Sequence, residues 1–256
     1  MGVIRTDKWL EESFNDRLKI EENILDTVNM REHVLIEVLN RIGLYQPNLK
    51  TNKTYQNMKE RKVWHRIALY HKKYKKAWDG PDIPIFLFPM ASEVFSLFRS
   101  PNKHKSGIAF IDKLFLFISE KVKDKELEAL FVHEYHHTTR LESLGGQVKH
   151  RLADSIIMEG LAEFAVSEYC GESYLAPWIT NYQTKEIEEL ITEKFKPNFD
   201  MKRSDPLHDK LLFGHGTMPK MAGYAAGYKL VKDYADLHSM KTRDMIGLST
   251  DKIING

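Results

Sequence analysis

The chain has a single cysteine, Cys170, among its 256 residues. One thiol cannot form an internal disulfide, and such a composition suits a reducing cytosol. We do not expect Cys170 to act as a nucleophile, because it ends an apolar segment. No apolar run approaches the roughly 18 residues that a membrane-spanning helix needs, and no signal-peptide pattern opens the chain. The sequence therefore predicts a cytoplasmic protein with no membrane association.

An excess of either charge is also lacking, because 38 Lys and Arg face 36 Asp and Glu. The hydrophobic content of 42% and the charged content of 29% are those of an ordinary globular protein. A chain of this length can bury one sizeable core, alone or with a helical extension. Internal repeats and low-complexity tracts are absent.

Basic residues nevertheless gather in one segment. Between Lys50 and Lys76 there are ten Lys and Arg against Glu60 alone, with Tyr55, Trp64, Tyr70 and Tyr74 interleaved. Such a segment could bind nucleic acid or another anionic partner. A solvated amphipathic helix is the simpler interpretation, because charge runs alone are weak signals. Nucleic-acid binding is therefore kept as an alternative and is not expected.

The most informative segment is residues 133–137, His-Glu-Tyr-His-His, which fits the pattern H-E-x-x-H. On a helix, His133 and His137 project from the same face and can converge on one cation, with Glu134 close to a metal-bound water. Leu130 and Leu141 continue the stripe of the two histidines. The simpler interpretation is a pair of helical histidines satisfied by neighbours and a solvated glutamate.

Catalytic zinc usually has three protein ligands, so a third must come from elsewhere in the chain. The next helical segment, residues 154–170, carries Glu159 and Glu163 in an otherwise apolar stretch. Carboxylates in such surroundings are costly unless they are paired or bind a cation. Gly160 weakens a helix interior but allows another helix to approach closely. A helix with two histidines packed on a helix with a buried glutamate would make a His-His-Glu site.

H-E-x-x-H followed by a helix containing Glu-Gly-x-Ala-Glu resembles the gluzincin group of metallopeptidases. That resemblance implies that Glu159 is the third zinc ligand. It also implies that Glu163 orients one of the histidines, a role that fixes the tautomer and the direction of the ring.

More narrowly, three motifs together resemble a bacterial family of predicted zinc-dependent proteases, the YjaZ-like family. These motifs are residues 133–137, residues 158–163 (Met-Glu-Gly-Leu-Ala-Glu) and residues 219–228 (Pro-Lys-Met-Ala-Gly-Tyr-Ala-Ala-Gly-Tyr), in the family's order. The resemblance covers residues 80–256 and implies a zinc-dependent peptidase. It identifies the family more firmly than it identifies the activity.

In the mechanism implied by these parts, Glu134 accepts a proton from the attacking water and passes it to the leaving amine. The developing oxyanion then needs a donor besides zinc. Tyr224 and Tyr228 are the candidates, with Tyr224 preferred. Two tyrosines at this helical spacing also commonly pack into a core with their hydroxyls satisfied. His215, with His208 upstream, could instead be exposed or bind substrate.

We expect an α+β fold of the zincin type, in which a small mixed sheet packs on the H-E-x-x-H helix between helical N-terminal and C-terminal parts. Residues 1–80 would form a helical extension and residues 81–256 the metallopeptidase domain. The edge strand, which we expect at 107–111, would pair with an extended substrate. The predicted elements are helices over 8–28, 31–42, 53–78, 124–144, 154–170, 176–194 and 220–238, and strands over 83–88, 107–111 and 114–118.

The sequence thus predicts a zinc metallopeptidase in which His133, His137 and Glu159 bind Zn²⁺ and Glu134 is the base. Its substrate would be a peptide or protein. The alternative is a non-catalytic or regulatory zinc-binding protein whose basic N-terminal helices bind nucleic acid or a protein partner. Substrate-binding residues, cleavage preference and oligomeric state have no signal in the sequence.

Overall fold

The computed structural model describes residues 1–28, 33–91, 104–216 and 218–256. The fold is of the α+β class, with a small mixed sheet and many helices. It consists of two compact units, Met1–Thr138 and Thr139–Gly256. The separate division expected at residue 80 stays a prediction. None of the helices in the described ranges is both long and apolar enough to cross a membrane.

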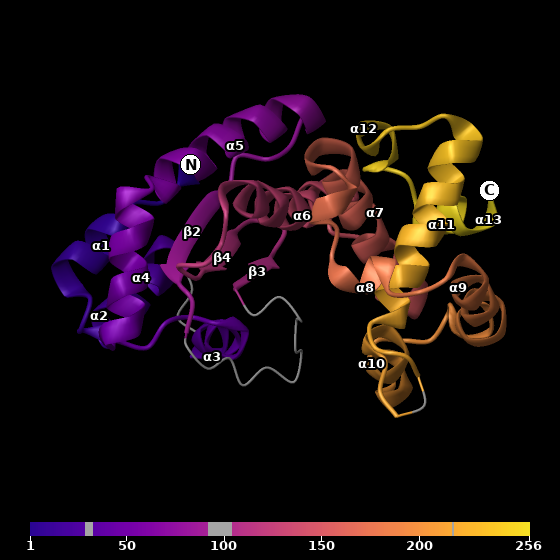
Figure 1. The fold of residues 1–256 in the computed structure, drawn as a ribbon, viewed down its shortest axis with the longest axis horizontal. Coiled ribbons are helices and arrows are strands. Elements are labelled where there is room, and N and C mark those ends of the chain that lie inside the picture. Colours follow the sequence, from indigo (N-terminus) through magenta and orange to yellow (C-terminus); the bar gives the residue numbers. More distant parts are fainter. Residues whose placement is uncertain (29–32, 92–103, 217) are drawn as a thin grey trace. The chain divides into compact units, whose positions relative to one another are not determined.

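The first unit combines the sheet with the N-terminal helices (Figure 1). Its elements in chain order are β1 (Gly2–Val3), α1 (Thr6–Ser13), α2 (Arg17–Thr27), α3 (His33–Ile42), α4 (Leu49–Glu60), α5 (Val63–Trp78), β2 (Pro84–Pro89), β3 (Lys105–Ala109), β4 (Leu114–Ile118) and α6 (Asp124–Ser143), whose last residues belong to the second unit.

The single helix expected over residues 8–28 is two helices, α1 and α2. The chain breaks at Asp16, whose carboxylate accepts a hydrogen bond from the Lys19 backbone N–H at 3.1 Å and so caps α2. The hydrophobic period continues across this break, which is why periodicity alone missed it. For the helix expected over 31–42, the start at Arg31 lies outside the described residues, and α3 is seen from His33.

The helix expected over residues 53–78 is also two helices, α4 and α5. Lys62 stands between them with φ +52°, a left-handed conformation that no helix can continue through. Helix α4 begins earlier than expected, at Leu49, because Asn48 and Thr51 form a reciprocal capping box.

The sheet has the strand order β1-β2-β4-β3, with β3 antiparallel to β4 and the other pairs parallel. Strand β4 lies where the sequence predicts it, β2 and β3 are shifted by one or two residues, and the short β1 was not predicted. Within the described residues β3 is an edge strand, as expected.

The two faces of the sheet carry different side chains because successive residues of a strand point to opposite sides. Phe86, which pairs with Phe115, stacks on it at 4.5 Å between ring centroids, and Trp9 of α1 lies 6.2 Å from Phe86. The opposite face carries Leu87 and its partner Leu116, both fully buried. The N-terminal helices therefore cover the aromatic face. The aliphatic face, on the other side of the sheet, is buried as well.

The second unit is entirely helical (Figure 1). After the end of α6 its elements are α7 (Leu152–Cys170), a 3₁₀ turn (Glu172–Tyr174), α8 (Pro177–Thr180), α9 (Thr184–Leu190), a π-helical turn (Ile191–Phe195), a 3₁₀ turn (Lys196–Asn198), α10 (Pro206–Phe213), α11 (Ala222–His238), α12 (Thr242–Met245) and α13 (Thr250–Asn255).

Two expectations for this unit are corrected. The helix expected over 176–194 is broken into α8, α9 and the π-helical turn. Between the helices expected over 176–194 and 220–238, where the sequence predicts no element, the chain forms α10 after Asp205. The Asp205 carboxylate accepts from the Leu207 backbone N–H at 2.8 Å, and Pro206 occupies the first helical position, where its missing N–H has no cost.

Helices α7 and α11 cross at two glycines. A Cβ built on Gly160 would lie 2.2 Å from the carbonyl oxygen of Gly227, and one on Gly227 would lie 2.1 Å from that of Ile156. Both distances are far below van der Waals contact, so the two backbones touch directly. The close approach expected at Gly160 is thus made by α11.

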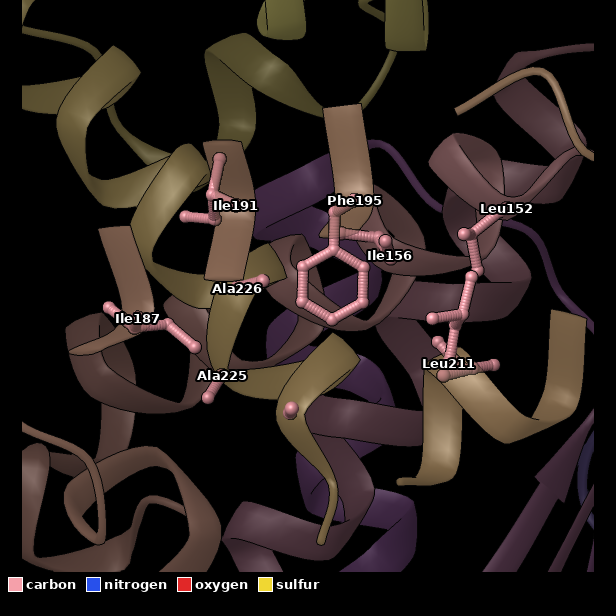
Figure 2. Packing of buried hydrophobic residues seen from close by; sticks show 10 residues of the cluster. Leu152, Ile156, Ile187, Ile191, Phe195, Leu211, Ala225 and Ala226 are labelled. Atoms are coloured by element: carbon pink, nitrogen blue, oxygen red, sulfur yellow. The ribbon is translucent and has the colours of Figure 1, made fainter. Parts of the chain in front are cut away.

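Hydrophobic side chains from five segments close around this crossing. Figure 2 shows the Phe195 ring at the centre of a cluster that includes Ile156 of α7, Ala226 of α11 and Leu211 of α10. All of these are at most 5% exposed, so the cluster is a core. It fixes the helix that carries Glu159 and Glu163.

We expect Gly160→Ala to lower the free energy of unfolding by about 3 kcal/mol, as for overpacked cores, although alanine is the better helix former. Gly145→Ala is the matched control, because a Cβ there meets nothing and only its φ of +58° opposes alanine, a cost of roughly 1–2 kcal/mol. Urea unfolding of both variants measures which of the two loses more unfolding free energy. A smaller loss for Gly160→Ala than for Gly145→Ala would contradict the crossing.

Candidate metal centre

Helix α6 presents the H-E-x-x-H residues on its open side. Across residues 131–140, His133, Glu134 and His137 are half-buried, whereas every other side chain is buried. His133 and His137 lie on one face of the helix at i and i+4, and Glu134 neighbours His137 at i and i+3. The rest of the helix is therefore fixed by packing, and the motif faces an accessible space.

Aromatic rings hold this part of α6 against α5. Tyr135 stacks on Trp78 at 5.9 Å between ring centroids, and Phe131 lies 6.1 Å from Tyr74. The Tyr135 hydroxyl also donates to the carbonyl oxygen of Pro81 at 2.8 Å. Tyr135 therefore has a structural role between the two candidate ligands.

The Nε2 atoms of the two histidines lie close together. Their Nε2 atoms lie 3.1 Å apart, and the rings are nearly perpendicular at 88°. Two ligands on a tetrahedral zinc, each about 2.0–2.1 Å from the ion, would be separated by about 3.3 Å. The pair His133 and His137 thus already has nearly the spacing that one zinc ion requires.

Glu134 lies over the edge strand. A Cβ built on Gly107 of β3 would lie 2.6 Å from Cγ, 2.7 Å from Cδ and 2.8 Å from Oε1 of Glu134. The side chain of the candidate base therefore occupies the space that any other residue at 107 would fill. Nothing in the sequence motif points to this contact.

Glu159 and Glu163 differ in their surroundings on α7. Glu159 is half-buried, whereas Glu163 is 4% exposed and accepts a hydrogen bond from the Ala176 backbone N–H at 3.0 Å. The half-buried carboxylate of Glu159 is accessible to an ion and to water. The buried carboxylate of Glu163 is held in place by its hydrogen-bond donor. The orientation of a histidine by Glu163 stays a prediction.

Three ligand-type side chains form a group that could hold a metal ion. One ligand atom each of His133, His137 and Glu159 lies within 4.8 Å of the others. Two imidazole nitrogens and one carboxylate oxygen are a donor set typical of catalytic zinc, with a fourth position left for water. The group is therefore compatible with zinc binding.

The two tyrosines of α11 have different neighbours. The Tyr224 ring contacts Trp178 edge-on at 5.9 Å and Phe213 at 6.0 Å. Tyr228 is half-buried, burial raises the pKa of its hydroxyl, and a hydrogen bond with the side chain of Ser167 partly opposes that shift. The choice between Tyr224 and Tyr228 as a catalytic contact stays a prediction.

The remaining histidines near the motifs are structural or exposed. His208 is 1% exposed and lies between the Ser155 hydroxyl at 3.1 Å and the Asp209 carboxylate at 2.8 Å. His215 is exposed in the turn after α10. His136 is buried with its ring edge-on to Trp78.

Comparison with known proteins agrees with these motifs. Residues 63–255 match the model of the family described as "Predicted Zn-dependent protease (DUF2268)". The chain belongs to this family. It is 37% identical over 214 residues to the "Uncharacterized protein YjaZ" of Bacillus subtilis (strain 168), across 83% of this chain and 82% of that protein.

A second Bacillus subtilis (strain 168) protein is more distant. The "Uncharacterized protein YjfC" is 26% identical over 140 residues, across 50% of this chain and 46% of that protein. No solved structure matches the chain. The family match includes the H-E-x-x-H helix, α7 and α11, so all three motifs lie inside it.

The basic segment between Lys50 and Lys76 is largely neutralised within the first unit. Six of its ten cations lie within 4.0 Å of a carboxylate, namely Lys53, Lys59, Arg61, Arg66, Lys73 and Lys75. Tyr55, Trp64 and Tyr74 are buried in the core. These contacts favour the structural interpretation of the segment over a nucleic-acid surface.

One ion-pair cluster clamps α6 to α5 near the candidate ligands. The Glu128 carboxylate accepts from Lys73 and Lys125 at 2.8 Å and from the Tyr74 hydroxyl at 2.7 Å. Burial raises the pKa of Glu128, but these hydrogen bonds outweigh it and hold the pKa at about 2, below the ordinary 4.5.

Because the folded-state pKa is lowered, the stabilisation by Glu128 is complete above pH 4.5 and is lost as pH falls toward 2. We therefore expect Glu128→Gln to be less stable than wild type at pH 7, with a difference that narrows below pH 4.5. Urea unfolding between pH 7 and pH 3 measures this, with exposed Glu60→Gln as control. A pH-independent difference would contradict the clamp.

Proposed function

We propose that this protein is a zinc-dependent peptidase of the zincin type, with His133, His137 and Glu159 as zinc ligands. The observation that carries the proposal is the convergence of these three side chains, with Glu134 directly beside the first of them. Membership in a family described as predicted zinc-dependent proteases supports the same conclusion.

The residues fit zinc better than other common ions. Imidazole nitrogen suits zinc, whereas Mg²⁺ and Ca²⁺ prefer sites made of oxygen ligands. The Nε2 separation of 3.1 Å is close to the edge of a tetrahedral zinc site. Three protein ligands and one open position distinguish catalytic zinc from structural zinc, which has four protein ligands.

In the proposed reaction, zinc supplies Lewis acidity, which makes water a nucleophile near neutral pH and polarises the substrate carbonyl. Glu134 accepts the proton of the attacking water and delivers it to the leaving amine. Glu163 supports the ligands from its buried position on α7. The Tyr224 hydroxyl, on helix α11, donates to the oxyanion.

The edge strand β3 suits a substrate in extended conformation. Ser119 N–H donates to the His104 carbonyl oxygen at 3.0 Å, and Phe110 N–H to the Lys113 carbonyl oxygen at 2.9 Å. Antiparallel pairing alternates, so even-numbered residues of β3 hydrogen-bond to β4, and the backbone groups of Gly107 point to the other edge. An extended peptide could add to that edge beside Glu134.

Elemental analysis of tag-free protein tests the metal site. We expect about one zinc per chain in wild type and in Glu134→Gln, and a loss of at least tenfold in zinc affinity in Glu159→Ala, because a direct ligand is removed. Glu172→Ala, which removes a carboxylate just after α7, is the matched control. Full zinc retention by Glu159→Ala would disprove the ligand assignment.

A peptide-library assay tests the reaction. We expect Glu134→Gln to lower kcat by about 10²-fold or more, typical of a lost general base, with zinc retained. In the same assay Tyr224→Phe should lower kcat by about 10²-fold, as for a lost oxyanion donor, and Tyr228→Phe should have little effect. Zinc-loaded wild type without turnover of any peptide would favour the non-catalytic alternative.

A further inference from the structure

We propose that Gly107 is a positioning residue that sets the place of the Glu134 side chain. The inference rests on the proposed function and deepens it, because it concerns the placement of the proposed general base. None of the sequence motifs includes this glycine. Gly107 is the central residue of the edge strand β3. A Cβ there would come within 2.6 Å of Glu134 Cγ and 2.8 Å of its Oε1.

The conformation of Gly107 does not by itself explain a glycine. Its φ lies outside the left-handed range, so any residue could adopt its backbone conformation. A glycine in a strand interior weakens the strand, because it has no side chain to pack and is flexible when unfolded. What requires glycine here is space, and the space is filled by Glu134.

The direction of the strand explains why this one position matters. Lys105 and Gly107 lie on the same side of β3, and Lys105 Nζ donates to the Glu126 carbonyl oxygen of α6 at 2.9 Å. That side of the strand therefore faces α6, and Gly107 is its residue nearest to Glu134. Ser106 and Ile108 point to the opposite side.

Gly107 thus has two properties that matter for the site. Because it has no side chain, it leaves room for the carboxylate of Glu134. Its N–H and carbonyl groups point to the outer edge of β3, where no other strand pairs among the described residues. A substrate backbone bound at Gly107 would lie directly beside the base. A methyl group at this position would push the base away from its place.

The first test uses metal-free protein and needs no activity. We expect Gly107→Ala to lower Tm in the wild-type background, because Glu134 must shift. In the Glu134→Ala background the same change should leave Tm unchanged or raise it, because the space is empty and alanine fits a strand better than glycine. Equal shifts in the two backgrounds would show that Glu134 does not fill this space and would overturn the proposal.

The second test measures zinc and kinetics. We expect Gly107→Ala to keep its zinc affinity within about twofold and its KM nearly unchanged, while kcat falls by about 10–100-fold, as for a misplaced catalytic group. Ser106→Ala, on the opposite side of β3, is the control. Combined with the shorter Glu134→Asp, Gly107→Ala should cost less than it does alone.

The outcomes separate the two proposals. A fall in zinc affinity that matches the fall in kcat would make Gly107 a structural residue and overturn the inference. An unchanged kcat with zinc bound would overturn it as well. If wild type shows no turnover but the Tm effects depend on Glu134, the peptidase assignment fails and the control of Glu134 by Gly107 stands.

Discussion

The packing of α6 against α5 is the constraint on which the candidate site depends. A helix with converging ligands must leave one face open, and its remaining sides must be buried firmly enough to hold that face in place. Phe131 and Tyr135 achieve this with Tyr74 and Trp78 of α5. The same contacts that stabilise the first unit therefore determine where the motif points.

Glycine has the same role in both units: its lack of a side chain lets a neighbouring helix or side chain approach closely. At Gly160 and Gly227 the backbones of α7 and α11 touch, which fixes the helix carrying Glu159 and Glu163. At Gly107 the vacated space receives the side chain of Glu134. Glycine weakens regular structure by roughly 0.5–1 kcal/mol relative to alanine. At these positions that cost is offset by contacts that no larger residue permits.

The sequence predicts which ligand-type side chains gather at the candidate site better than it predicts where the surrounding helices begin and end. H-E-x-x-H and the glutamates of α7 are local patterns, and local spacing on a helix determines which side chains share a face. The errors come from features that periodicity does not contain. Lys62 ends a helix through its left-handed backbone, Asp16 caps a new helix inside a continuous apolar pattern, and Asp205 begins α10 in a segment that looks like a loop. Each break depends on one residue and leaves the hydrophobic period intact.

The contact between Gly107 and Glu134 shows most clearly what a single sequence does not reveal. The two residues are on different elements, and a glycine in a strand has no chemistry of its own. The register of β3 on β4 shows that the backbone groups of Gly107 point to the outer edge. The contacts of Lys105 and Gly107 show that this side of the strand faces α6. In the proposed peptidase, recognition at this point would use main-chain hydrogen bonds rather than side-chain contacts. The base would then be aligned with the extended backbone of the substrate itself, whatever side chains that substrate carries.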